Sequence, residues 1–327
     1  MANGKDDPQQ LDDAKQTGAV ARDTVLAPQG HDDYEAKIAE LGLGEYIEAV
    51  DAQGFAVIPP EKVAPPEFIE RIRSAVLRVA EERTGEKFAL DKNASSGKYR
   101  SEPQMPGQFI LYYLLFEDRV FEEWLSNETM LAMVSHYMRG EGQLSSLTSF
   151  VKWNGGGYGD TLGLHSDTPR PVSRKLPAQC NDVVNSALCL TDYSEENGAI
   201  AFVPGSHKLC RHPKPGEDVD KAVAVEAAAG SLIFFNGNVW HGAFPKKTNG
   251  LRLTLTSYIC HQRLKTQEQY QRHVTREMLE RNPPAFARLL GAADPMGWTS
   301  IGPQFSRFAA WTRNPETVPD SILELHP

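Results

Sequence analysis

Apolar positions along the chain follow two different periods, and the change falls near residue 140. Before that point, apolar residues recur at helical spacing in residues 34–41, 46–50, 68–79, 120–125 and 129–138. The exception is residues 54–58, a short apolar run that ends at Pro59 and reads as a buried strand. The first 140 residues therefore predict several amphipathic helices and one early strand.

After Gly140 the helical period gives way to short apolar segments separated by Gly, Pro, Asn and Asp. Eight of them read as strands: residues 144–151, 161–165, 183–190, 200–203, 222–225, 231–235, 239–244 and 251–260. Many short strands with regular turn signals are typical of a sandwich or barrel, and the jelly roll has eight. We therefore predict an α+β fold with a jelly-roll core over about residues 144–260 and helices packed on one outer face.

The remaining segments complete the expected organisation. Residues 1–30 are polar, with few bulky apolar positions, and predict a disordered leader; residues 31–327 predict a single domain. Within it, residues 84–108 are expected to be a long loop, residues 109–116 core, and residues 261–327 an extension with a helix at 266–280.

Composition limits the partners of this 327-residue chain. Its formal charge of −9 argues against a nucleic-acid partner, which would require a basic surface. No apolar run approaches the roughly 18 residues that a membrane span needs, and the polar N-terminus lacks the apolar run of a secretory signal. We expect a cytoplasmic protein whose four widely spaced cysteines are free thiols.

The chemistry-bearing stretch is Leu164-His165-Ser166-Asp167, which pairs an imidazole with a carboxylate two residues apart. Side chains at i and i+2 point the same way in extended structure, so the two can bind one cation. His241 lies in another short apolar segment and offers a third ligand. Two imidazoles and one carboxylate form the facial triad of non-haem Fe(II) oxygenases, although His165 and Asp167 alone fit a hydrogen-bonded surface pair about equally well.

Arg252 follows His241 by eleven residues, and Asn249-Gly250 between them is a tight-turn signal. If residues 241–258 form a hairpin, an even-numbered loop places Arg252 and Thr254 on the same side as His241. A buried arginine requires an anionic partner, and its planar fork suits a carboxylate. This pattern predicts a dicarboxylate co-substrate that chelates the metal at one end and meets Arg252 at the other; a surface ion pair is the plainer alternative for Arg252.

These motifs, together with Asn197-Gly198 and the Pro204-Gly205-Ser206-His207 stretch, resemble the phytanoyl-CoA dioxygenase (PhyH) family. The resemblance implies a double-stranded β-helix fold and Fe(II)- and 2-oxoglutarate-dependent oxygenation of a small molecule. It implies His165, Asp167 and His241 as iron ligands and Arg252 as the partner of the distal carboxylate of 2-oxoglutarate. Hydroxylation of an unactivated C–H bond with O₂, releasing succinate and CO₂, is the expected reaction.

One position departs from the family pattern. Family members often have Ser or Thr two residues after the second His, to assist the distal carboxylate, where this chain has Ala243. We expect Thr254 or Asn185 to supply the missing donor. Asp167 favours hydroxylation over halogenation, because halogenating relatives replace this carboxylate with a small residue.

A locally basic loop follows the metal motif. Arg170 and Arg174, with Arg100 from the early loop, can bind or steer an anionic primary substrate, although a solvated loop explains their charge equally simply. Two other functions remain open on the sequence: a zinc hydrolase with the same His/Asp/His ligands, and a non-catalytic jelly-roll binding protein.

Overall fold

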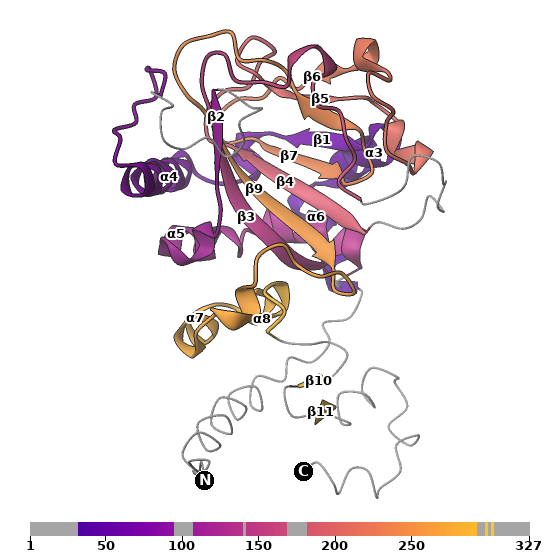
Figure 1. The fold of residues 1–327 in the computed structure, drawn as a ribbon. Coiled ribbons are helices and arrows are strands. Elements are labelled where there is room, and N and C mark those ends of the chain that lie inside the picture. Colours follow the sequence, from indigo (N-terminus) through magenta and orange to yellow (C-terminus); the bar gives the residue numbers. More distant parts are fainter. Residues whose placement is uncertain are drawn as a thin grey trace, which may run out of the picture. The chain divides into compact units, whose positions relative to one another are not determined.

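The computed structural model describes residues 32–94, 107–139, 142–168, 182–292, 298–299 and 302–303. The chain divides into two compact units, Asp33–Glu268 and a second formed by Met1–Asp32 with Gln269–Pro327. The larger unit holds two antiparallel sheets, and Figure 1 shows the smaller of them above the larger. No helix among the described residues is both long and apolar enough to cross a membrane.

Six antiparallel strands form the larger sheet. In spatial order they are β1 (Phe55–Ile58), β7 (Leu232–Asn236), β4 (Val183–Cys189), β9 (Arg252–His261), β3 (Gly142–Lys152) and β2 (Gln108–Leu111). The smaller sheet contains three strands in the spatial order β6 (Val223–Ala224), β5 (Ile200–Phe202) and β8 (His241–Ala243). Consecutive strands alternate between the sheets at β4–β5 and at β7–β8–β9, which is the connectivity expected of a jelly roll.

Helices cover the outer face of the larger sheet, as predicted (Figure 1). They are α2 (Asp32–Leu41), α3 (Gly44–Gln53), α4 (Pro66–Thr84), α5 (Arg119–Trp124) and α6 (Glu128–Met138). Trp124 of α5 donates from its indole nitrogen to the Ser257 hydroxyl of β9 at 3.0 Å, which anchors the helical layer to the central strand. Single-turn 3₁₀ helices connect these elements at Pro60–Lys62, Leu114–Phe116, Gly159–Thr161, Ser206–Leu209 and Val219–Lys221.

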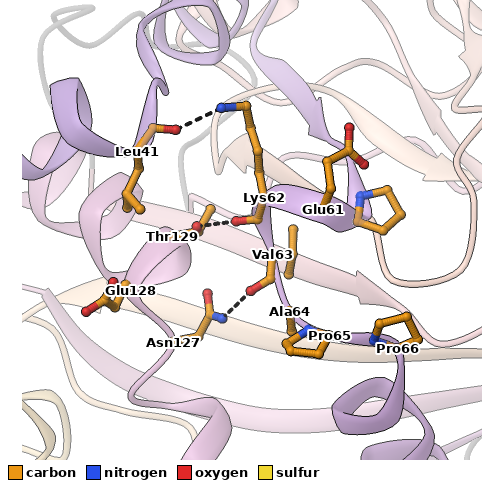
Figure 2. Close-up of a pocket in the computed structure, with 11 residues that line it drawn as sticks. Leu41, Glu61, Lys62, Val63, Ala64, Pro65, Pro66, Asn127, Glu128 and Thr129 are labelled. Atoms are coloured by element: carbon orange, nitrogen blue, oxygen red, sulfur yellow. Dashed lines mark hydrogen bonds between the residues drawn. The ribbon is translucent and has the colours of Figure 1, made fainter.

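A hollow of about 590 Å³ lies in this helical layer, between the end of α2, the Pro60–Pro66 segment and the start of α6. Figure 2 shows hydrogen bonds from some of its polar side chains to backbone carbonyls of the same lining. The Lys62 amine donates to the Leu41 carbonyl at 2.8 Å, and the Asn127 amide donates to the Val63 carbonyl at 2.7 Å. We call this hollow the outer pocket.

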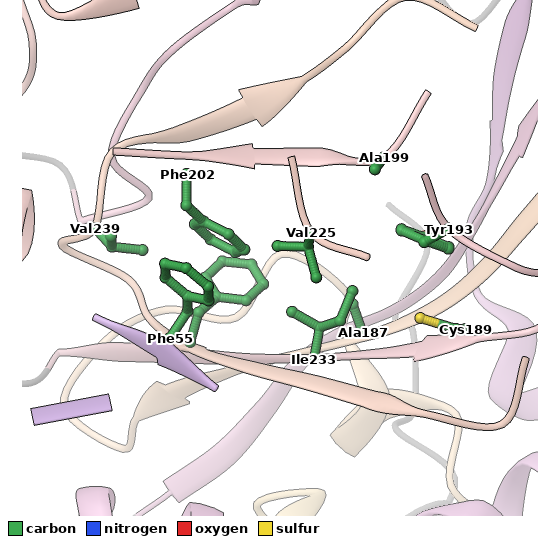
Figure 3. Close-up of a cluster of buried hydrophobic side chains, with 10 residues drawn as sticks. Phe55, Ala187, Cys189, Tyr193, Ala199, Phe202, Val225, Ile233 and Val239 are labelled. Atoms are coloured by element: carbon green, nitrogen blue, oxygen red, sulfur yellow. The ribbon is translucent and has the colours of Figure 1, made fainter. Parts of the chain in front are cut away.

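The core between the two sheets is built from residues that alternate along the strands. Phe202 of β5 stacks on Phe55 of β1 with ring centroids 4.3 Å apart. Figure 3 shows this pair at one end of a buried cluster that extends through Val225 and Ile233 to Tyr193. Two members of this cluster, Ala187 and Phe235, also line the cavity described below.

The second unit is described between Gln269 and Ala292 and at four later residues. It contains a 3₁₀ turn at Tyr270–Arg272, α7 (Arg276–Arg281), α8 (Pro284–Leu289) and the paired strands β10 (Trp298–Thr299) and β11 (Gly302–Pro303). The single helix predicted at residues 266–280 is therefore wrong. Thr275 caps α7 through a bond from Met278, and Pro283 and Pro284 start a separate α8.

Two further expectations require correction. Residues 161–165 do not form a strand, because Leu162 and Gly163 have φ values of 53° and 64°, and only the His165–His241 bridge remains. β8 and β9 do not form a hairpin, since they belong to different sheets and the segment between them crosses from one to the other. The predicted core run at 109–116 is partly exposed, with Tyr112 at 47%.

Candidate metal centre and active site

A cavity of about 290 Å³ lies inside the barrel and is lined from both sheets. We call it the barrel cavity. Because side chains alternate along a strand, the register sets which residues face it. Thr254 pairs with Phe150 on one side, and Thr256 pairs with Ala187 on the other. His165, Asp167, His241 and Arg252 all line this one cavity, so the structure brings together the residues that the sequence motifs single out.

Three of these side chains converge as a cluster of potential metal ligands. The ligand atoms of His165, Asp167 and His241 all lie within 4.8 Å of one another. Each imidazole presents its Nε2 to the carboxylate, with 3.5 Å from His165 Nε2 to Asp167 Oδ1 and 3.5 Å from His241 Nε2 to Asp167 Oδ2. No other group of three such ligands occurs among the described residues.

Backbone pairing places the two histidines side by side. His165 and His241 exchange N–H···O bonds of 2.9 Å in each direction, so their side chains leave the same side of the bridge. A Cβ on Gly242 would lie 2.0 Å from the Leu162 carbonyl oxygen. The segment that carries His165 can approach β8 only because residue 242 is glycine.

Both imidazoles are oriented through their other ring nitrogen. His165 Nδ1 lies 2.8 Å from the Gly163 carbonyl, and His241 Nδ1 lies 3.0 Å from the Val239 carbonyl. These bonds keep the proton on Nδ1, which leaves the Nε2 lone pairs facing Asp167. Burial lowers the pKa of His241 to about 4, so this ring is neutral and ready to bind a metal at physiological pH.

The carboxylate of Asp167 is also held in place. The Asn185 amide donates to Asp167 Oδ2 at 2.6 Å, and the Tyr258 hydroxyl donates to the Asp167 backbone carbonyl at 3.2 Å. Burial raises the pKa of Asp167, but His241, His165 and Asn185 together outweigh it and leave that pKa lowered. Asp167 is therefore an anion at neutral pH.

Arg252 begins β9 and is 3% exposed. Its Nη1 donates to the Tyr193 hydroxyl at 2.5 Å and to the Thr254 hydroxyl at 2.9 Å. Its Nε is buried without a hydrogen-bond partner, and no described residue accepts a bond from Nη2. A guanidinium with one end satisfied and the Nε edge free is arranged to bind a carboxylate with two parallel bonds.

Two buried lysine side chains lie close to Arg252. Lys152 of β3 stands directly opposite it in the strand register and is completely buried. The Lys152 amine donates to the Phe244 carbonyl at 2.7 Å, and Lys246 is 2% exposed. None of the three side chains forms an ion pair with a described acid. Burial, and then Arg252 and Lys246, lower the pKa of Lys152 to about 6, so its amine is mostly uncharged at neutral pH. An anion bound beside Arg252 would favour protonation of this amine.

The donor set fits iron. Two imidazoles and one carboxylate on adjacent backbone segments can cover one face of an octahedral ion and leave the other positions open. Cys189, Cys210 and Cys260 are buried free thiols outside the ligand cluster. The triad therefore matches a non-haem Fe(II) site better than a thiolate zinc site.

The other predicted residues have mixed outcomes. Thr254 lies beside Arg252 as expected, whereas the Asn185 amide contacts Asp167 and not Arg252. Arg100, Arg170 and Arg174 lie outside the described residues, as does Cys180. Tyr112 lines the barrel cavity. His207, His212 and His261 lie outside the ligand cluster.

Two functional candidates, Tyr193 and Lys152, were missed from the sequence. Both are positioned by contacts between segments that are distant in the sequence. Lys152 pairs with Arg252 across two strands, and Tyr193 forms a backbone bridge with Ala227. The only sequence signal is Lys152 at the end of an otherwise uncharged strand. An isolated charged residue in a buried strand is a candidate partner for the site.

Comparison with known proteins supports the same assignment. The family model for phytanoyl-CoA dioxygenase (PhyH) matches residues 50–254. The dioxygenase af480 of Aspergillus fumigatus is 28% identical over 189 residues, which cover 57% of this chain and 59% of that protein. The dioxygenase trt7 of Aspergillus terreus is 30% identical over 131 residues, which cover 37% and 40%. The chain spans about half the length of the curated relatives that it matches.

Solved structures show the fold. HygX from Streptomyces hygroscopicus, solved with nickel, 2-oxoglutarate and hygromycin B bound, matches with a TM-score of 0.51 at 20% identity, over 68% of this chain and 89% of that one. The non-haem α-ketoglutarate-dependent carbocyclase SnoK from nogalamycin biosynthesis matches with a TM-score of 0.50 at 19% identity, over 67% and 83%. The jelly-roll fold predicted from the sequence is confirmed.

Proposed function

Because the chain belongs to the phytanoyl-CoA dioxygenase (PhyH) family, we propose that it is an Fe(II)- and 2-oxoglutarate-dependent oxygenase. The reaction is the hydroxylation of an unactivated C–H bond of a small organic molecule with O₂, releasing succinate and CO₂. One observation carries this proposal. The same cavity holds a His/Asp/His cluster and a buried arginine whose Nε has no partner.

One part of the cavity would bind the metal, and the other would bind the co-substrate. His165, Asp167 and His241 would hold the iron, which when bound supplies the oxidation chemistry with O₂ and 2-oxoglutarate. Asn185 keeps the Asp167 carboxylate in one rotamer through its 2.6 Å bond. Arg252 binds the distal carboxylate of 2-oxoglutarate through its free edge, and Thr254 fixes the opposite end of the guanidinium.

The lining of the barrel cavity disfavours a zinc hydrolase. Such an enzyme requires a general base close to the metal. Among the described lining residues, the only carboxylate and the only imidazoles are those of the ligand triad. A hydrolase also leaves Arg252 without a role. A non-catalytic binding protein has no need for three oriented metal ligands.

The described lining beyond the triad and Arg252 is uncharged and combines apolar side chains, such as Ile110 and Phe150, with polar ones. Ser146, Thr148, Thr256 and Gln108 present hydroxyl and amide groups, while Tyr158 presents an aromatic ring. The anionic substrate predicted from Arg100, Arg170 and Arg174 stays a prediction, as does a cytoplasmic location. An unchanged Michaelis constant for the true substrate in Arg170→Ala and Arg174→Ala would remove the case for an anionic one.

The test measures 2-oxoglutarate turnover and binding together. With Fe(II) and ascorbate, we expect succinate formation that a chelator abolishes. Calorimetry on the metal-loaded protein should show 2-oxoglutarate binding that Arg252→Ala weakens by about a hundredfold, because a hydrogen-bonded charge pair contributes about 3 kcal/mol. Arg71→Ala, which removes an exposed guanidinium paired with Glu123, should bind normally. If the metal-loaded wild-type protein neither binds nor turns over 2-oxoglutarate, the proposal is contradicted.

A further inference from the structure

Tyr193 lies just beyond β4 and is held there at both backbone groups. Its N–H donates to the Ala227 carbonyl at 2.8 Å, and the Ala227 N–H donates back at 3.2 Å. The side chain is 3% exposed. Figure 3 shows it at one end of the buried cluster, next to Cys189. The phenol is therefore a fixed group.

The ring and the hydroxyl of Tyr193 both contact Arg252. The guanidinium carbon lies 4.7 Å from the ring centroid, and Nη1 donates to the phenol oxygen at 2.5 Å. The phenol oxygen is also hydrogen bonded to the Thr254 hydroxyl. Tyr193 thus contacts Arg252 by stacking and by hydrogen bonding, and both contacts restrict how the guanidinium can rotate.

The hydrogen bonds of Arg252 show what this restriction achieves. A guanidinium has five N–H donors in a rigid plane. Tyr193 and Thr254 accept from Nη1, while Nε is buried and has no partner. Because Nη1 is occupied, the side of the plane formed by Nε and Nη2 is the one left for a ligand. That edge is the one that binds a carboxylate with two parallel bonds.

Ala243 of β8 lines the same cavity with a methyl group, which has no donor and no acceptor. Thr254 lines the cavity with a hydroxyl, and the phenol of Tyr193, which belongs to the buried core cluster, is hydrogen bonded to that hydroxyl. Burial, partly offset by Arg252, raises the pKa of Tyr193 to about 12, so the phenol stays protonated at neutral pH.

We propose that Tyr193 is the positioning residue of the acid site: it holds Arg252 with its Nε edge toward the cavity and thereby sets the affinity and selectivity for a dicarboxylate co-substrate. This inference rests on the proposed function. Tyr193 acts through Arg252, so its removal changes co-substrate binding and leaves the metal ligands in place.

The test uses Tyr193→Phe, which removes only the hydroxyl and keeps the ring packed in the core. Into Ni(II)-loaded protein we would titrate 2-oxoglutarate and, separately, 2-oxobutyrate, a mono-acid that lacks the distal carboxylate. Tyr137→Phe is the matched control, because it deletes another buried phenol hydroxyl, bonded at 3.0 Å to Asp51 and remote from the cavity.

We expect Tyr193→Phe to weaken 2-oxoglutarate binding by about tenfold, the effect of one hydrogen bond to a charged group. Its KM for 2-oxoglutarate should rise similarly, with little change in kcat. Binding of 2-oxobutyrate should be equal in wild type and variant, and Tyr137→Phe should match wild type for both acids. Tyr193→Leu, which also removes the stacking, should lose more than Tyr193→Phe.

Two results would overturn the inference. The first is unchanged 2-oxoglutarate affinity in Tyr193→Phe while Arg252→Ala still loses it. The second is an equal loss for both acids, which indicates a general disturbance of the site. A wild-type protein that binds neither acid would contradict the proposed function itself, so the two failures are distinguishable.

Discussion

The outer pocket and the barrel cavity differ in a way that separates a structural hollow from a functional one. The outer pocket is the larger, at about 590 Å³ against about 290 Å³. Its polar groups bond to one another: Thr129, for example, donates to the Lys62 carbonyl at 2.5 Å. The barrel cavity instead holds a buried arginine nitrogen without a partner, and two imidazoles directed at one carboxylate.

The difference teaches that unsatisfied chemistry, and not volume, identifies the site. A buried polar group without a partner costs free energy. Of the described buried side-chain atoms without a partner, only Arg252 Nε belongs to a residue that lines the barrel cavity. None of the residues that line the outer pocket has a buried side-chain atom without a partner. Substitutions in the two hollows should therefore have opposite signatures, which the following changes test.

Loss of a metal ligand should have the largest effect. Asp167→Ala removes the carboxylate that faces both imidazoles, and we expect metal affinity and turnover to fall at least about a hundredfold, beyond the loss seen for residues that only support a ligand. Glu128→Ala, which removes a carboxylate from the outer pocket, should leave both unchanged. Mass spectrometry measures the metal content, and succinate formation measures turnover. If Asp167→Ala and Glu128→Ala changed both quantities equally, the proposed difference between the barrel cavity and the outer pocket would be wrong.

A methyl group at residue 242 should also disable the barrel cavity. In Gly242→Ala the Cβ would lie 2.0 Å from the Leu162 carbonyl, so the His165 segment must move away from His241. We expect weakened metal binding together with a lower melting temperature. Gly44→Ala, beside the outer pocket's helix α2, meets nothing within 4 Å and should be nearly neutral. Normal metal binding in Gly242→Ala would show that the two segments can separate without cost.

The buried lysine makes stability depend on pH. The folded-state pKa of Lys152 is about 6, below its ordinary value of 10.5. Between these values the unfolded state binds more protons than the folded state, so the free energy of unfolding should rise with pH. Below about pH 6 both states are protonated, and the folded protein carries the full cost of the buried charge. In Lys152→Met the free energy of unfolding, measured with urea between pH 6.5 and 7.5, should depend less steeply on pH. We expect its slope to fall by about 1.4 kcal/mol per pH unit.

Lys246 provides the control for this dependence. Burial lowers its pKa to about 8, so Lys246→Met should change the slope only at higher pH. An unaltered slope between pH 6.5 and 7.5 in Lys152→Met would mean that Lys152 is charged in the folded protein and already has an anionic partner.

The smallest effect is expected in the outer pocket. Thr129→Val removes the donor to the Lys62 carbonyl and should cost about 1 kcal/mol of stability, the usual value of such a bond. Turnover and 2-oxoglutarate affinity should equal those of wild type. A specific loss of turnover in Thr129→Val would give the outer pocket a role that its geometry does not suggest.

Local patterns were enough to predict most of the larger unit. Apolar periodicity located α2 to α6, β1 and most barrel strands, because these elements bury one face each. Spacing and the surrounding motifs predicted His165, Asp167 and His241 as metal ligands, and the structure brings these three side chains together. The predicted strand at residues 161–165 was wrong because the backbone conformation there does not follow the apolar pattern: Leu162 and Gly163 have positive φ values.

Contacts between distant segments could not be predicted in the same way. The β8–β9 hairpin was wrong because a tight-turn signal at Asn249-Gly250 does not reveal a change of sheet, and Arg252 reaches the cavity through its pairing with β3 and β4. Tyr193 and Lys152 meet Arg252 only through that pairing and the segments it brings together. Such residues become visible when the register is known.

The central claim is that one cavity binds iron at the triad and the distal acid of 2-oxoglutarate at Arg252. An anaerobic titration of the Fe(II)-loaded protein with 2-oxoglutarate, followed by the charge-transfer absorption that chelation of Fe(II) produces, tests it most directly. We predict a saturable band that is absent in Asp167→Ala and that needs about a hundredfold more 2-oxoglutarate in Arg252→Ala. No band in the wild-type protein at saturating 2-oxoglutarate, or a band unaffected by Arg252→Ala, would contradict the claim.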